Sequence, residues 1–475
     1  MSVLSKKARL FSRDILKMLR LSLPIIIAQL GSVFFGIIDT IMVGNMSGKI
    51  GKDSLAAAGF ANTLFFLIAC VGIGIFAAIA PLVAKAKGSE NRHECGLIFY
   101  GGMKISFLVG ALQTVVLLVI CHFFWIFDQK PEVATLAVSY LRVIAFSTVP
   151  MMFFLAVKNF SDGLSFTKPA MIITISGLVI NVFFNWILIY GNLGFSGMGL
   201  YGSGLATLVA RVVMACFMII YVLESNFFQK YLPNVLAQHP TTVFSKKILT
   251  LGFPSGMMYF FEMGAFFGVA VIVGRISTGA LAASNIILSI ATFTYMLAAG
   301  VSFAGAISVG SAMGIRDRAK ILREGKISIG LVTALMLISS LFLLFFGENV
   351  IHLYNKEDDV LQVALPLLSI FIFYQLADGV QAVGVGILRG LSDVNIPTFM
   401  AIFSYWIIGL PLSYILSDFF WLGVQGAWIG LSVGLGISAI LLTVRFFILA
   451  KKDNLMMNEK PIVTLEKPIL EENKA

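Results

Sequence analysis

Charged residues are scarce in this chain. Of 475 residues, 12% are Asp, Glu, Lys or Arg, whereas a soluble globular protein carries about 25%. Hydrophobic residues make up 59%, and the mean hydropathy is +0.95. A protein with so few charged residues cannot expose its whole surface to water. The composition therefore excludes a soluble protein and predicts one continuous domain that faces lipid.

Cysteine and histidine are also few, with four of each. The cysteines form no CxxC pair, and the histidines are scattered through expected loops and helix ends, so neither pattern is typical of a metal centre. No nucleophile–base constellation is apparent either. We therefore expect no enzyme activity, no cofactor and no metal centre built from these residues.

Long apolar runs are abundant. Twelve runs of about 18 residues or more are long enough to cross a bilayer. Backbone amides in hydrocarbon must be satisfied within the protein, so the runs form helices or a closed barrel, and the lack of alternation excludes the barrel. We predict an all-α integral membrane protein with twelve transmembrane helices. The expected spans are residues 19–43, 55–80, 97–125, 135–160, 169–190, 200–224, 249–273, 280–310, 325–347, 360–388, 397–417 and 424–449.

The distribution of positive charge predicts the orientation. Most of the 34 Lys and Arg residues lie in the two tails and in the loops after the even-numbered spans. Because such residues stay on the cytoplasmic side, both termini should be cytoplasmic. The net charge of +10 then reflects topology and contact with anionic lipid, not nucleic-acid binding. The loops on the opposite side hold only Lys49, Lys52, Lys130, Arg275 and Lys356.

The two halves of the chain resemble each other. LSLP at 21–24 matches LGFP at 251–254, and SDGLSFTKP at 161–169 matches LRGLSDVNIP at 388–397. Matches at a nearly constant offset indicate a parallel duplication, whose two-fold axis runs along the membrane normal and places a site between the halves. The predicted domains are a cytoplasmic tail (1–18), a six-helix bundle (19–224), a cytoplasmic linker (225–247), a second six-helix bundle (248–450) and a cytoplasmic tail (451–475).

Three acidic residues lie inside the expected spans: Asp39, Glu262 and Asp378. A carboxylate at the bilayer centre costs about 2.5–3.5 kcal/mol on translocon scales, so such residues persist mainly where they have a function. Tyr374 and Gln375 share a helix face with Asp378, being four and three residues before it. These acids are candidates for binding an ion or a substrate; the alternative is hydrogen bonding between neighbouring helices.

Further polar residues lie within the apolar runs. Asn181 and Asn185 are four residues apart on the fifth span, where they could line a cavity or bond helices together. Arg211 lies in mid-span and needs a partner, which the sequence does not identify. We add Tyr259, Gln375 and Gln381 as candidates for lining a substrate cavity.

Several segments carry a family resemblance. FFGIIDTIMVG of span 1, NVFFNWILIYG of span 5, the LGFP…FFE stretch of span 7 and FYQLADGVQAVGVGILRG of span 10 resemble the multidrug and toxic compound extrusion (MATE) family, in its NorM-like branch. The similarity covers roughly residues 15–450. It implies that Glu262 and Asp378 bind a cation, with Tyr295 in aromatic contact with it. Tyr374, which shares the helix face of Asp378, is a further candidate for this cation site. The resemblance also places Asp39, Asn181, Asn185 and Thr207 in an N-terminal polar or proton-binding cluster, where some members have aspartate at position 185.

The resemblance implies an exporter of small organic cations at the bacterial inner membrane, which we expect to be monomeric. Sodium or protons would drive it by alternating access of the two bundles. Glu262, Asp378 and Tyr295 could offer several oxygens and an aromatic face to Na⁺, which we prefer, whereas a proton needs a single suitable carboxylate. One alternative is a lipid-linked saccharide flippase, which should carry cationic cavity residues. Another is a membrane-embedded enzyme, for which no catalytic constellation is visible.

Overall fold

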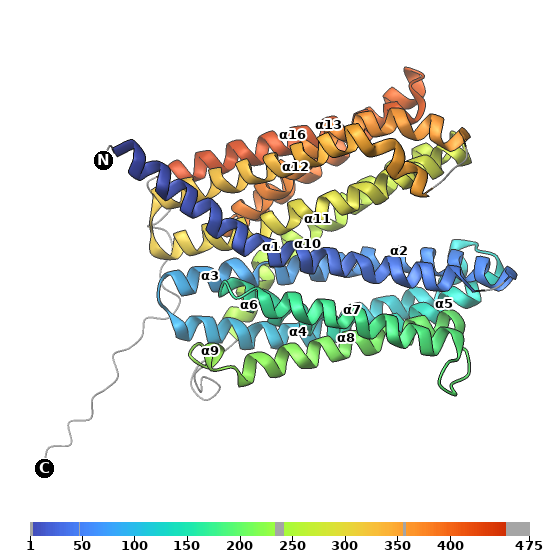
Figure 1. Ribbon diagram of the computed structural model, residues 1–475, viewed down its shortest axis with the longest axis horizontal. Coiled ribbons are helices and arrows are strands. Elements are labelled where there is room, and N and C mark those ends of the chain that lie inside the picture. Colours follow the sequence, from blue (N-terminus) through green and yellow to red (C-terminus); the bar gives the residue numbers. More distant parts are fainter. Residues whose placement is uncertain (1–2, 47, 233–241, 355–357, 453–475) are drawn as a thin grey trace, which may run out of the picture.

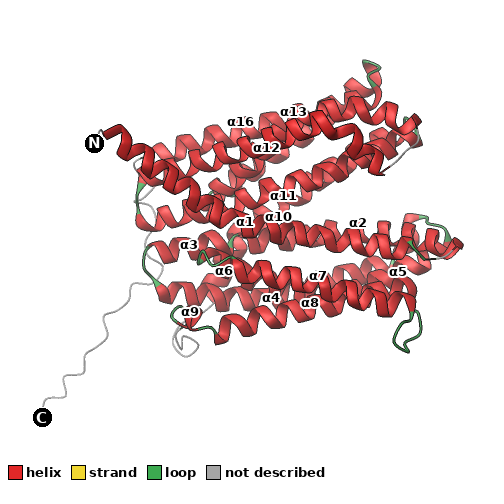
Figure 2. Ribbon diagram, viewed as in Figure 1, coloured by secondary structure: helices red, strands yellow, loops and turns green. Residues whose placement is uncertain are grey.

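The computed structural model describes residues 3–46, 48–232, 242–354 and 358–452. Within these residues the chain is almost entirely helical and contains no strand (Figure 2). The predicted tail after residue 452 and the central part of the predicted linker, 233–241, lie outside the described residues. The first predicted tail is helical from Val3 onward, because α1 begins there.

The helices form two bundles that lie side by side (Figure 1). The first bundle contains α1 (Val3–Gly44), α2 (Gly48–Ala77), α3 (Ile79–Gly88), α4 (Arg92–His122), α5 (Pro131–Phe146), α6 (Thr148–Gly163), α7 (Lys168–Tyr190) and α8 (Gly199–Glu224), with the short η1 (Phe124–Phe127) and α9 (Asn226–Gln229). The second contains α10 (Thr242–Gly274), α11 (Thr278–Ile315), α12 (Arg318–Tyr354), α13 (Asp358–Gly390), α14 (Asn395–Ile402), α15 (Leu410–Tyr414) and α16 (Gly423–Lys451), with the π-helical turns η3 (Phe403–Gly409) and η4 (Ile415–Phe419).

The spans agree with the sequence-based prediction. Eleven helical segments of the described chain are long and apolar enough to cross a membrane, and the bent pair α5–α6 makes a twelfth. Each of the twelve predicted runs falls on one of these segments, and most of the helices extend beyond the apolar run. The prediction of an all-α membrane fold with twelve spans is therefore confirmed.

Prolines explain two breaks within spans. Pro81 and Pro150 lack the N–H that would bond the carbonyl four residues earlier, and the ring crowds that carbonyl. The carbonyls concerned belong to Ala77 and Phe146, which are the last residues of α2 and α5. The α5–α6 axis bends by 40° at this point, with Ser147 between the two helices.

The two bundles meet mainly near one end of the molecule, which we call the basic end; it comprises residues 85–92, 163–168, 316–320 and 389–395. Here α2 and α3 pack against α10 and α11 (Figure 1). Glycines allow the close approach: a Cβ atom on Gly88 would overlap the backbone of Ser311 at this end, and one on Gly74, nearer the middle of the spans, would overlap the backbone of Gly256. A small apolar core that includes Met18, Ala80 and Ile307 also fills the space between the bundles. The end where the bundles touch is therefore packed closely.

Candidate functional site

Four polar residues of the first bundle form one hydrogen-bonded cluster. Asp39 of α1 accepts a hydrogen bond from Asn185 Nδ2 of α7 at 2.5 Å and another from Thr207 Oγ1 of α8 at 2.9 Å. Asn181 Nδ2 donates to Thr207 Oγ1 at 3.3 Å, and Asn185 Nδ2 also reaches Asn181 Oδ1 at 3.2 Å. Three helices thus bring together all four residues predicted for this bundle.

Close helix packing makes this cluster compact. On α7, Gly177 leaves room for the side chain of Met214 of α8, since a Cβ there would overlap its sulfur. Asn181 and Asn185 follow one and two turns later on α7, and both are fully buried. Asp39 is 6% exposed and Thr207 4%. The buried carboxylate keeps hydrogen-bond partners on both oxygens, as a polar group removed from water requires.

Arg211 lies one helical turn after Thr207 on α8. Its Nη1 donates to Ser147 Oγ at 2.6 Å, at the junction of α5 and α6. Its Cζ atom lies 4.7 Å from the centroid of the Phe65 ring of α2, within the range of a cation–π contact. Within the described residues Arg211 forms no ion pair with Asp39, whose oxygens are engaged by Asn185 and Thr207. Asp39 and the half-buried Arg211 are therefore held separately, although they lie on neighbouring helices.

The second bundle contains the other two predicted acids. Glu262 of α10 and Asp378 of α13 are 7% and 5% exposed, and they interact electrostatically. Tyr405 of η3 donates its hydroxyl to Glu262 Oε1 at 3.3 Å. Asp378 has no hydrogen-bond partner among the described residues. An unpaired carboxylate this deep in a bundle is costly, so Asp378 is well suited to bind a cation or a proton.

Tyrosines lie near these two acids, and Tyr295 and Tyr374 each interact electrostatically with both. Tyr374 lies one turn before Asp378 on α13 and packs against Trp428 of α16, with ring centroids 5.9 Å apart. Tyr259 and Tyr295 pack against the same core. The Tyr259 hydroxyl accepts a hydrogen bond from Arg389 Nη2 at 3.3 Å. The second site thus combines carboxylates with the electron-rich faces that attract organic cations.

The two glutamine candidates lie on α13 as well. Gln375 is fully buried, donates to Ser340 Oγ at 2.8 Å and accepts from Ser339 Oγ at 2.9 Å. Its amide therefore links α13 to α12. Gln381 is 1% exposed and lies three residues beyond Asp378, on the same helix face.

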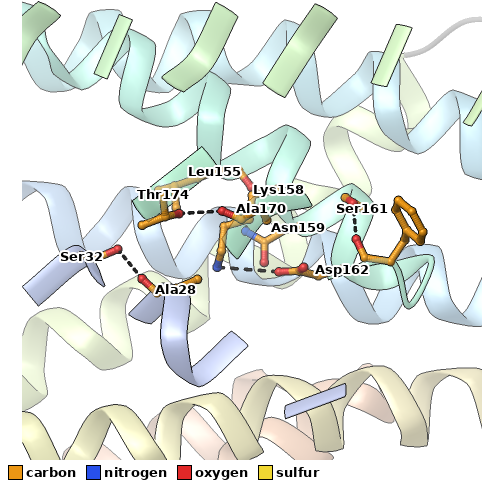
Figure 3. A network of polar contacts seen from close by, with 10 residues as sticks. Ala28, Ser32, Leu155, Lys158, Asn159, Ser161, Asp162, Ala170 and Thr174 are labelled. Atoms are coloured by element: carbon orange, nitrogen blue, oxygen red, sulfur yellow. Dashed lines mark hydrogen bonds and ion pairs between the residues drawn. The ribbon is translucent and has the colours of Figure 1, made fainter. Parts of the chain in front are cut away.

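A second buried polar network escaped the sequence-based interpretation, because Asp162 lies just beyond the expected span 135–160. Asp162 lies within α6 and is 2% exposed, and its Oδ2 is 3.7 Å from Nζ of Lys158 (Figure 3). Asp162 Oδ1 and Asn159 Oδ1 have no hydrogen-bond partner among the described residues. Nζ of Lys158 also lies 5.5 Å from the ring centroid of Phe303 on α11, so this network reaches across to the second bundle.

Tyr405 was also missed. Tyr405 lies in the apolar span 11, and nothing in the sequence of that span indicates that its hydroxyl bonds to Glu262, which lies 143 residues earlier. One signal for Asp162 did exist. In the repeat alignment SDGLS matches LRGLS, which pairs Asp162 with Arg389, and both are buried charges in the structure.

The protein thus consists of two duplicated six-span bundles, and each bundle contains buried carboxylates next to polar or aromatic side chains. This arrangement is typical of secondary transporters. Comparison with known proteins identifies the family. The family model MatE matches residues 24–187 and 254–415, which is more than half of the chain. The chain therefore belongs to the MATE family and lies in its NorM-like branch.

Individual relatives and solved structures support the same family assignment. The chain is 30% identical over 451 residues to the multidrug resistance protein NorM of Vibrio cholerae, covering 94% of this chain and 97% of that protein. It is 32% identical over 450 residues to the multidrug resistance protein MdtK of Yersinia enterocolitica, covering 93% and 97%. Its fold is similar to that of the eukaryotic MATE transporter AtDTX14, with a TM-score of 0.85, 19% identity, and 94% and 97% coverage. It also resembles an outward-facing MATE transporter, with a TM-score of 0.84, 21% identity, and 92% and 96% coverage.

Proposed function

We propose that this protein is a multidrug exporter that expels small organic cations in exchange for Na⁺ or H⁺. The observation that carries the proposal is the unpaired carboxylate of Asp378, buried among aromatic rings beside Glu262. Relatives that match nearly the whole chain carry the name multidrug resistance protein, which supports the same function. The protein would act as a monomer with small organic cations and membrane lipid as its partners.

The site suggests how binding and release would be coupled. An organic cation would be attracted by the charges of Asp378 and Glu262 and by the faces of Tyr374 and Tyr295, in a medium that screens charge poorly. Na⁺ or H⁺ arriving from outside would neutralise the same carboxylates. Because ion and substrate compete for overlapping charge, entry of one favours release of the other.

Alternating access would require the bundles to separate at one end and approach at the other. The observed contacts lie toward the basic end, which the positive-inside rule assigns to the cytoplasm together with both termini. A bacterial inner membrane is the expected location. The structure would then correspond to a state closed toward the cytoplasm, and resemblance to an outward-facing MATE transporter is consistent with this assignment.

The proposal is tested by ethidium efflux from energised cells expressing Asp378→Asn or Glu262→Gln. We expect either substitution to abolish efflux while leaving expression and insertion intact, because removing a buried charge eases insertion. Glu132→Gln, at an exposed position of α5, is the matched control and should transport normally. Full efflux by Asp378→Asn would refute the assigned role.

The coupling ion is tested separately in inside-out vesicles. We favour Na⁺, because two carboxylates and nearby phenols offer several oxygens to a dehydrated ion, the ligands that hard cations prefer. Uptake of ethidium on an imposed Na⁺ gradient, with no pH gradient, is the expected result. Uptake that follows only the pH gradient would instead point to a proton held at Asp378 or Asp39.

A further inference from the structure

Arg389 is a buried cation in the bundle that contains Glu262 and Asp378. It is 3% exposed, lies in the last turn of α13, and is the only buried base of the second bundle within the described residues. It forms no ion pair with any described residue, and its Nε has no hydrogen-bond partner among them. The duplication aligns it with Asp162, which has Lys158 beside it. The charge of Arg389, by contrast, is not balanced by an acid in direct contact.

The guanidinium lies on the basic-end side of both acids. On α13, Arg389 comes eleven residues after Asp378, which is about three full turns and about 16 Å along the axis, so the two residues share one helix face. On α10, which begins near the basic end, Tyr259 comes about one turn before Glu262. Arg389 Nη2 donates to the Tyr259 hydroxyl at 3.3 Å, and its Cζ atom lies 5.8 Å from the ring centroid. This contact joins α10 to α13 between the acids and the basic end.

The helices on both sides of this contact are packed closely. A Cβ atom on Gly386 of α13 would overlap the backbone of Ser302 on α11, so these two helices touch directly. Thr398 Oγ1 of α14 donates to the carbonyl oxygen of Pro254 on α10 at 3.0 Å, which holds α14 against α10. An ion moving from the two acids toward the basic end within this bundle would therefore pass close to the guanidinium of Arg389.

A fixed positive charge repels a small cation, and the repulsion is strong where little water screens it. Arginine side chains exclude cations and protons from membrane pores in this way. The charge of Arg389 extends to the cation site, because Arg389 and both acids interact electrostatically with Tyr295. If Arg389 served only to join α10 to α13, a neutral donor could do so without the cost of burying a charge. The positive charge itself therefore needs an explanation.

We propose that Arg389 is an electrostatic barrier that prevents Na⁺ or H⁺ bound at Glu262 and Asp378 from leaking into the cytoplasm while the basic end is closed. Such a leak would dissipate the ion gradient without exporting a substrate, so the barrier keeps ion movement coupled to export. When the bundles separate at this end, water reaches the guanidinium and screens its charge, and the ion can leave. This proposal rests on the proposed export function and adds a residue that determines its coupling.

The test measures ion leak through the purified full-length protein in liposomes, with no organic substrate present. Entry of radioactive Na⁺, and of protons reported by a trapped pH-sensitive dye, is followed at a fixed membrane potential. Arg389→Met removes the charge but keeps an unbranched stem, whereas Arg389→Lys keeps the charge but loses the guanidinium fork. Arg445→Met is the matched control, because it removes another cation at the basic end, one that pairs with Asp393. Size-exclusion profiles establish that each variant is folded.

We expect Arg389→Met to raise the leak of Na⁺, H⁺ or both about tenfold or more, since repulsion at close range in the protein interior is large enough to change a rate by that factor. Arg389→Lys and Arg445→Met should stay within about twofold of the wild type. The proposal is overturned if Arg389→Met leaks no more than the wild type, or if Arg389→Lys or Arg445→Met leaks as much as Arg389→Met, which would indicate a role in packing alone. Ethidium uptake by wild-type liposomes on imposed gradients tests the export function separately, because its failure would leave the comparison of leaks unaffected.

Discussion

The buried pair of Lys158 and Asp162 gives the sharpest quantitative prediction. Nζ and Oδ2 are 3.7 Å apart, and the two side chains are 6% and 3% exposed. Removing one partner leaves the other charge buried without compensation, which costs about 3–5 kcal/mol. We expect Lys158→Met and Asp162→Asn each to lower the free energy of unfolding by about this amount.

The double variant separates an ion-pair effect from general damage. With both charges removed no uncompensated ion remains, so its loss should be well below the sum of the two single losses. The free energies are measured by titrating purified protein with a denaturing detergent, with helicity as the signal. Glu348→Gln is the matched control: it removes an acid from an exposed i,i+4 contact with His352 and should cost under about 0.5 kcal/mol. Additive single effects, or a loss below about 1 kcal/mol for Asp162→Asn, would refute the reasoning.

Two further substitutions test contacts made between helices. Gly74→Leu should lower export strongly and weaken association of the bundles, because its side chain would overlap the backbone of Gly256. Gly59→Leu is the control: a Cβ there meets open space, so ethidium efflux should be that of the wild type. Tyr405→Phe removes the hydrogen bond to Glu262 at 3.3 Å but keeps the ring, so we expect a several-fold change in the Na⁺ or H⁺ concentration for half-maximal efflux. An unchanged ion dependence would show that the phenol does not tune Glu262.

The spans could be predicted because a bilayer leaves the chain few choices. An apolar run long enough to cross it must be helical, and its length is visible in the sequence. The helix ends beyond the apolar runs were not visible. This is why Asp162, two residues beyond the expected span 135–160, was not singled out, although α6 continues to Gly163 and Asp162 is buried.

The two candidate sites were predictable to different degrees. Asp39, Glu262 and Asp378 could be singled out individually, because an acid within an apolar span is rare. Their partners depend on which helices become neighbours, and sequence spacing alone does not specify that. Thr207 came only from the family resemblance, and Tyr405 was missed because a tyrosine in an apolar run is ordinary until its hydroxyl is found near Glu262.

The last prediction concerns how the basic end stays closed. The first helix of each bundle extends onto the other bundle and forms an ion pair there. Asp14 of α1 lies 2.8 Å from Arg323 of α12, and Lys247 of α10 lies 3.8 Å from Glu94 of α4. Because α1 corresponds to α10 in the duplication, the two pairs join corresponding helices with their charges reversed, although Lys247 aligns with Lys17, about one turn after Asp14.

Partly exposed pairs of this kind contribute about 0.2–1 kcal/mol each, enough to shift an equilibrium between closed and open forms a few-fold. Glu94→Lys replaces attraction with repulsion of Lys247, so we expect a cysteine at Ile307, which is buried between the bundles, to react several-fold faster with maleimide. Glu94→Lys combined with Lys247→Glu restores opposite charges and should return the rate to that of the parent protein. If the exchanged pair reacts as fast as Glu94→Lys alone, attraction between these charges does not hold the basic end closed.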